Sequence, residues 1–125
     1  MAHIRKTILV LLASESGSVH TCRILRDAGH ICVTATGEPA GLEALATVHF
    51  DVLLTDHCMN NADSNHYFCE VRKISPWIAI VGIVEPGDDI SSMNKTLDCD
   101  ATVQVPLSLT RLAWVFDFKL RYFGD

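Results

Sequence analysis

Short apolar runs alternate with amphipathic stretches along the whole chain of 125 residues. Runs with the length and bounding residues of buried strands occupy 7–13, 31–35, 50–55, 77–84 and 101–105. Helical spacing fills the stretches between and after them, over 16–28, 37–48, 65–73, around 90–97 and over 109–122. Strands that alternate with helices form βαβ units, whose crossovers cover both faces of a parallel sheet. The sequence therefore predicts an α/β, doubly wound fold with a five-stranded parallel sheet and five helices.

Apolar spacing also predicts which side of each helix faces the sheet. The first helix has Ser14 and Ser16 as candidate N-caps and Gly29 as its stop. Its inward residues are predicted to be Val19, Cys22, Leu25 and Ala28, and those of the second helix Leu42 and Leu45. A polar loop is predicted over 57–63, between the third strand and the third helix.

Length and composition favour a single domain over 1–125, with no linker or repeat. The chain is 49% hydrophobic and 20% charged, which excludes a disordered polymer, and no apolar run reaches the ~18 residues of a membrane span. The net charge is −5 and the ten Lys and Arg residues are scattered, which argues against direct nucleic-acid binding. We therefore expect a cytoplasmic protein that binds neither membrane nor nucleic acid directly.

Cysteine and histidine spacing gives no metal motif. The five cysteines form no C-x-x-C pair and are predicted to be reduced, mostly buried apolar residues: Cys22, Cys32, Cys58, Cys69 and Cys99. The six histidines show no H-x-x-x-H or H-E-x-x-H spacing. No dedicated metal cluster is predicted.

Asp56 ends the apolar run of the third predicted strand. In open parallel sheets the functional crevice lies at the carboxyl ends of the strands, where this carboxylate is placed. Such a carboxylate can act as a nucleophile toward phosphorus, or it can cap the backbone of a loop. Position alone leaves both interpretations open.

The residues around Asp56 resemble the phosphoacceptor signature of bacterial response-regulator receiver domains, the chemotaxis-regulator type. The matching segment reads Asp51-Val-Leu-Leu-Thr-Asp56-His-Cys-Met59-Asn-Asn-Ala-Asp63. Met59 and Asp63 match the family, whereas its usual Pro, Gly and Gly are replaced by Asn60, Asn61 and Ser64. Further agreement lies in Gly29, Gly41-Leu-Glu-Ala-Leu45, Glu70-Val-Arg-Lys73 and Pro106. The resemblance covers essentially the whole chain and implies a flavodoxin-like fold of receiver topology.

The same resemblance exposes losses at the positions that serve the phosphoacceptor. The Mg²⁺-binding acid pair of the family falls on Leu12 and Ala13, and its Lys falls on Val105. Its Thr or Ser falls on Ile83, or on Gly82 or Val84 if the register slips by one residue. The aromatic residue of the fifth strand is replaced by Thr102. Protein ligands for Mg²⁺ are then reduced to Asp56 and the Cys58 carbonyl, with Glu15 as a weak third candidate that equally suits the start of a helix.

These losses imply a degenerate receiver, or pseudo-receiver. It would act in two-component phosphorelay signalling through protein–protein contacts, not as an enzyme and without a cofactor, with weak or no phosphorylation at Asp56. The alternative is a working phosphoprotein that takes a phosphoryl group from a histidine kinase at Asp56, with Mg²⁺ in a rebuilt divalent site. Under either interpretation the partner is a sensor histidine kinase or another signalling protein.

The last predicted helix carries two apolar stripes. One is predicted to face the core: Leu109, Leu112, Ala113, Phe116, Leu120 and Phe123. The second is formed by Trp114, Phe118 and Tyr122, with Arg111 on the same side. Aromatic residues beside arginine are frequent at interfaces, and we expect this stripe to form one, most simply in a homodimer.

Overall fold

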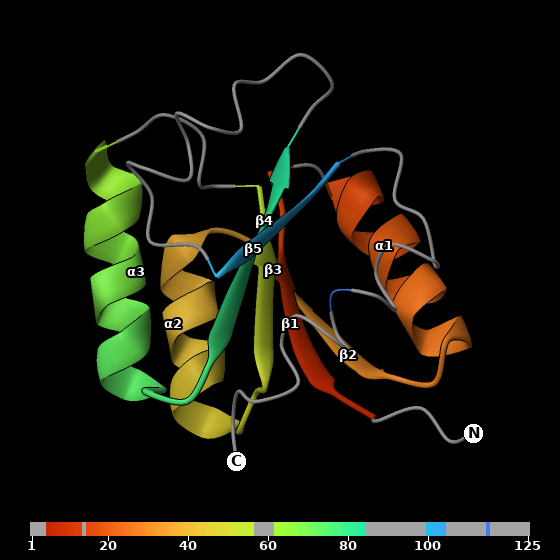
Figure 1. Cartoon of the computed structure of the whole chain (residues 1–125), viewed down its shortest axis with the longest axis horizontal. Coiled ribbons are helices and arrows are strands. Elements are labelled where there is room, and N and C mark those ends of the chain that lie inside the picture. The colour runs from red at the N-terminus through yellow and green to blue at the C-terminus, as the bar shows by residue number, and fades with distance from the viewer. Residues whose placement is uncertain (1–4, 14, 57–61, 85–99, 105–114, 116–125) are drawn as a thin grey trace.

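The computed structural model describes residues 5–13, 15–56, 62–84, 100–104 and 115. Within them lies a five-stranded sheet in the order β2-β1-β3-β4-β5, with every neighbouring pair parallel (Figure 1). Its strands are β1 (Thr7–Leu11), β2 (Ile31–Ala35), β3 (Val52–Thr55), β4 (Ala79–Val84) and β5 (Ala101–Gln104). The predicted α/β fold with a parallel sheet is confirmed.

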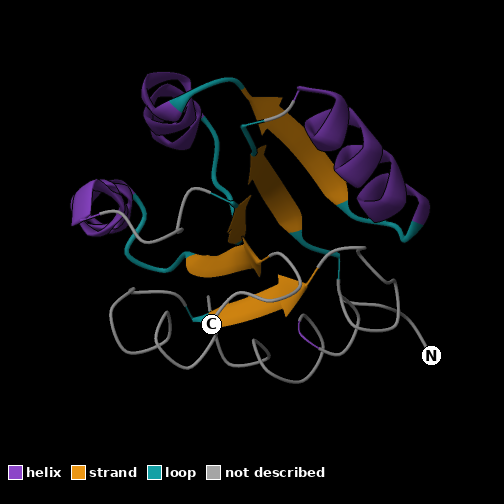
Figure 2. Cartoon of the chain, turned by 90° about the horizontal axis from the view of Figure 1, so that it is seen from above, coloured by secondary structure: helices purple, strands orange, loops and turns teal. Residues whose placement is uncertain are grey.

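Helices cover both faces of this sheet. The helix α1 (Glu15–Asp27) lies on one face, and α2 (Glu38–Thr47) and α3 (Ala62–Ile74) lie on the other (Figure 2). The predicted helices over 90–97 and 109–122 fall outside the described residues, except for Val115, which is fully buried. Val115 belongs to neither of the two apolar stripes predicted for the last helix.

The core consists of two layers, because side chains alternate between the faces of each strand. Along β1, Ile8 and Val10 join Cys22 and Leu25 of α1 in one cluster, which also contains Val115. Leu9 and Leu11 join a second cluster under α2 and α3. Its largest fully buried members are Phe50 and Phe68. The strands β1 and β3 are apolar and buried along almost their whole length because both of their faces are covered.

Several predicted element boundaries were wrong. The strand β1 ends at Leu11, because Leu12 and Ala13 turn toward the end of β3. The strand β3 begins at Val52 and not at Phe50. The predicted end of the fifth strand at Val105 lies outside the described residues. The helix α3 begins at Ala62, so Ala62 and Asp63 are helical and not part of a loop.

Trp77 was also assigned to a strand, but it lies in the turn before β4. There the Ile78 amide donates to the Ser75 carbonyl at 3.1 Å, which closes the turn. The indole Nε1–H of Trp77 donates to the Phe50 carbonyl at 2.8 Å, and its ring stacks on that of His49. Trp77 is apolar enough to extend the run of β4 in the sequence, although its indole fixes it to the neighbouring loop.

The helix α1 begins at Glu15, so Ser16 lies inside the helix and is not its N-cap, and Ser14 is not described. Gly29 has a φ of 96°, and the helix ends before it, at Asp27, as predicted. Val19 was expected to face the core but is 54% exposed. The buried side of α1 is centred on Ser18, Thr21, Cys22 and Leu25, and Val19 lies roughly a quarter turn or more from that centre.

Cys22 and Cys32 form a disulfide between α1 and β2, with 5.7 Å between their Cα atoms. The two residues are buried as predicted, but the expectation that they are reduced was wrong. Their separation of ten residues resembles no recognised pairing motif, so only the packing of α1 on the edge of the sheet brings them together. Cys69 is an exposed free thiol, and Cys58 and Cys99 are not described.

Tyr67 joins the two helices on the other face. Its hydroxyl donates to the Glu38 carbonyl at 3.1 Å, and a Cβ added at Gly41 would collide with the same hydroxyl. Tyr67 is 4% exposed. Burial, with a smaller contribution from the nearby Glu38 charge, raises the pKa of Tyr67 from 10.0 to about 12.

This shift predicts a loss of stability at alkaline pH. Between pH 10.0 and about 12 the unfolded chain releases the Tyr67 proton and the folded chain retains it, so the free energy of unfolding falls with rising pH. The slope is about 1.4 kcal/mol per pH unit. Urea unfolding of wild type and Tyr67→Phe should show the advantage of wild type shrinking across this window. Parallel losses in the two proteins would contradict the prediction.

Candidate functional site

Asp56 follows β3 directly at the carboxyl edge of the sheet, as predicted. The strand register places Leu11, Thr55 and Gly82 side by side on β1, β3 and β4. One residue further along each strand come Leu12, Asp56 and Ile83. Asp56 is half-buried, and Thr55 before it is completely buried, so the backbone that carries the carboxylate is fixed by the core.

The Asp56 carboxylate accepts a hydrogen bond from the backbone amide of Ala13. The Ala13 nitrogen lies 3.1 Å from Oδ1 and 3.4 Å from Oδ2. The helix α1 begins two residues later at Glu15, so the partial positive charge of its first turn lies on the same side. An amide donor at this distance orients the carboxylate.

The side chains of the neighbouring positions are apolar, as the sequence indicates. Leu12 is partly buried and packs against the core cluster under α1, and Ile83 is 5% exposed in that same cluster. Ala13 is exposed. Val105 and Cys58 lie outside the described residues, and Thr102 is half-buried on β5. No carboxylate or hydroxyl therefore stands at the positions given by Leu12, Ala13 and Ile83.

The residues around the Asp56 carboxylate do not fit a Mg²⁺ ion. The ion prefers several carboxylate and water oxygens in octahedral order, and neither Leu12 nor Ala13 has a side-chain oxygen. Across the part of the chain that is described, no three His, Cys, Asp or Glu side chains are grouped closely enough to hold a metal ion. Glu15, the weak candidate ligand, is exposed on the first turn of α1.

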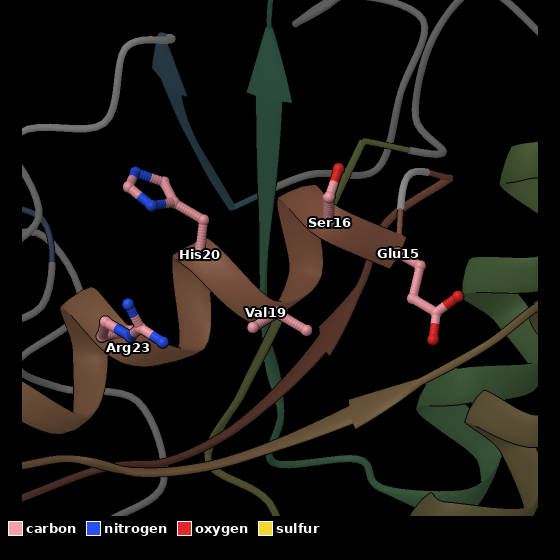
Figure 3. A pocket seen from close by; sticks show the side chains of 5 residues that line it. All are labelled: Glu15, Ser16, Val19, His20 and Arg23. Carbon is pink, nitrogen blue, oxygen red and sulfur yellow. The ribbon is translucent and has the colours of Figure 1, made fainter.

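Glu15 instead lines a shallow, open hollow along the outer side of α1, together with Ser16, Val19, His20 and Arg23 (Figure 3). The Glu15 carboxylate points away from His20 and Arg23 (Figure 3). This hollow was not predicted from the sequence, although Ser16, His20 and Arg23 recur at the spacing of one helix face. The predicted interface residues Arg111, Trp114, Phe118 and Tyr122 are not described.

No protein-family model and no curated protein matches the sequence. Solved structures do match. A response regulator receiver domain protein from Clostridium thermocellum has a TM-score of 0.73 and 21% identity, with 93% of this chain and 94% of that one covered. The chemotaxis response regulator CheY4 of Vibrio cholerae has a TM-score of 0.75 and 18% identity, with 94% and 100% covered.

NtrX from Brucella abortus has a TM-score of 0.78 and 21% identity, and the match covers 94% of this chain but 27% of that longer one. At these identities the likeness concerns the fold, and it confirms the receiver topology that the sequence predicts. Among the helices that are described, none is long and apolar enough to cross a membrane.

Proposed function

We propose that this chain is a receiver-type signalling domain of the two-component kind that acts through protein–protein contacts, with weak or no phosphorylation at Asp56. The observation that carries the proposal is the set of residues around the Asp56 carboxylate. The carboxylate accepts from the Ala13 amide at a position where an ordinary receiver has acidic side chains. Leu12 and Ile83 occupy the neighbouring positions, just after β1 and on β4. The matching solved structures support the signalling class through their fold.

The physical reason lies in the demands of phosphoryl transfer. The reaction depends on positioning and on cations that neutralise charge on the moving phosphoryl group. One backbone amide cannot replace a divalent ion. The side chains of Leu12, Ala13 and Ile83 provide no oxygen ligand and no hydroxyl. Without a group that contacts the phosphate differently in two states, phosphorylation also has no means to shift a conformational equilibrium.

A sensor histidine kinase or another signalling protein is the proposed partner, and no catalytic activity is proposed. A homodimer through Trp114, Phe118 and Tyr122 of the last predicted helix remains part of the proposal. Its test is sedimentation of wild type beside Trp114→Ala/Phe118→Ser.

Calorimetric titration with Mg²⁺ tests the missing divalent site. Wild type should give no saturable heat at millimolar Mg²⁺, because the site lacks its carboxylates. Ala13→Asp keeps the backbone amide, places one carboxylate back beside Asp56, and should gain measurable binding. Adding Asp56→Asn should remove that gain. Trp77 is a poor reporter for this experiment, because it precedes β4 and so lies at the amino ends of the strands, whereas Asp56 lies at their carboxyl ends.

Saturable binding by wild type at sub-millimolar Mg²⁺ would contradict the proposal. If Glu15→Gln then abolished the binding, the result would support the alternative, a working receiver with a rebuilt divalent site.

A further inference from the structure

The strand β2 is one edge of the sheet, and its outer backbone groups can be assigned from its pairing with β1 (Figure 1). The Ile31 amide donates to the Lys6 carbonyl at 2.9 Å, so Ile31 directs its backbone groups toward β1. Alternate residues of a parallel strand direct them to the same side. Val33 and Ala35 therefore also face β1, whereas the amides and carbonyls of Cys32 and Thr34 face the free edge.

One of these outward groups is occupied by a side chain of α1. The guanidinium Nη2 of Arg26 donates to the Cys32 carbonyl at 2.8 Å. Arg26 lies in the last turn of the helix, and the disulfide from Cys22 to Cys32 ties that same helix to that same strand residue. The guanidinium thus covers the middle of the free edge of β2.

The rest of the edge has the character of a strand-pairing surface. Ile31 is 48% exposed and Val33 is 39% exposed on the face of β2 that α2 and α3 leave partly open. None of the residues of β2 is charged. Natural edge strands usually carry charges, proline or bulges that prevent pairing with another chain, and β2 contains no charge or proline of its own.

We propose that the free edge of β2 is a pairing surface for a second copy of this chain, and that Arg26 closes it. In an antiparallel pair with its two-fold axis at Val33, Cys32 of each copy exchanges backbone hydrogen bonds with Thr34 of the other. The Cys32 carbonyl is the acceptor that Arg26 occupies. Each copy therefore loses one pairing acceptor while the guanidinium is in place.

The side chains favour a second copy as the occupant. The same two-fold axis places the exposed Val33 of one copy against Val33 of the other, and the exposed Ile31 against the edge of the buried Ala35. Because β2 is uncharged, two copies meet without like charges opposite one another. One strand edge is small beside an ordinary stable interface, so a single guanidinium can decide whether two copies pair through this edge.

Sedimentation equilibrium of Arg26→Met tests this proposal, because methionine keeps an aliphatic stem and removes the donor. Arg23→Met is the matched control, since Arg23 is exposed one turn earlier on the same helix. Self-association of Arg26→Met should be at least about tenfold stronger than that of the control, which corresponds to about 1.4 kcal/mol. Adding Val33→Lys should return it to the control level, because two lysines would then meet at the axis.

Hydrogen exchange provides a second measurement. The Thr34 amide of Arg26→Met should exchange more slowly as protein concentration rises, and that of wild type should not. Equal association of Arg26→Met and Arg23→Met would overturn the proposal, as would a dimer that Val33→Lys leaves intact. If Arg26→Met does not fold, Arg26→Lys, which lacks the planar guanidinium, is compared with Arg23→Lys on the same terms. These results do not depend on whether Asp56 is phosphorylated.

Discussion

Replacing Cys22 and Cys32 together by alanine should lower the free energy of unfolding by about 3 kcal/mol. The disulfide closes a loop with a sequence separation of ten residues. A cross-link over such a loop removes roughly this much conformational freedom from the unfolded chain, expressed as free energy. Denaturant unfolding of wild type and of the double variant, both without reductant, measures the difference.

Two controls separate the covalent bond from packing. Wild type unfolded in the presence of a dithiol reductant should lose most of the same stability, whereas the double variant should not respond to reductant. Cys69→Ala should change little, because Cys69 is exposed and unpaired by disulfide. Alkylation of all five cysteines in denatured, unreduced protein would show that the bond is not formed, and would contradict the prediction.

Asp100→Ala should destabilise the protein by about 2–3 kcal/mol, because it removes a carboxylate with two partners. Asp100 Oδ2 accepts from the Ile80 amide at 2.7 Å and from Arg72 Nη2 at 3.1 Å. The Ile80 residue is completely buried, and the Arg72 and Asp100 side chains are 26% and 17% exposed. The carboxylate thereby joins the start of β5 to β4 and to α3.

Asp100→Asn should cost less than Asp100→Ala, since an amide oxygen can still accept from the Ile80 amide. Glu70→Ala is the matched control on α3. It breaks the pair with Lys73, whose side chain is 72% exposed, and exposed pairs contribute at most about 1 kcal/mol. Equal losses for Asp100→Ala and Glu70→Ala in thermal unfolding would show that burial does not strengthen the Asp100 contacts.

The alternation of strands and helices, and the cover on both faces of the sheet, could be predicted because apolar runs mark buried strands and helical spacing marks the helices that cover them. The order of the strands in the sheet was implied only by the family resemblance. Element ends were predicted less well. Trp77 continues the apolar run of β4 in the sequence, but the hydrogen bond from Ile78 to Ser75 closes a turn around it and its indole donates to Phe50. Val19 has helical spacing with Cys22 and Leu25, yet Ser18 and Thr21 take the buried side of α1. Apolar spacing cannot identify small hydroxyl residues as inward-facing.

The position of Asp56 at the end of β3 could also be predicted, because it follows an apolar run and a family signature. Its partner could not. The donor is the backbone amide of Ala13, and every residue except proline has that group, so the residue type carries no signal. The same limit applies to the Cys32 carbonyl bound by Arg26, and to the disulfide, which depends on how α1 packs against β2.

Intact-mass analysis after incubation with a small-molecule phosphodonor and Mg²⁺ tests most directly whether Asp56 still serves as a phosphoacceptor. The apolar Leu12, Ala13 and Ile83 positions predict that the wild-type mass stays unchanged by the treatment, as does the mass of Asp56→Asn treated in the same way. Addition of one phosphoryl group to most of the wild-type protein, absent from Asp56→Asn, would contradict this and establish a working phosphoacceptor.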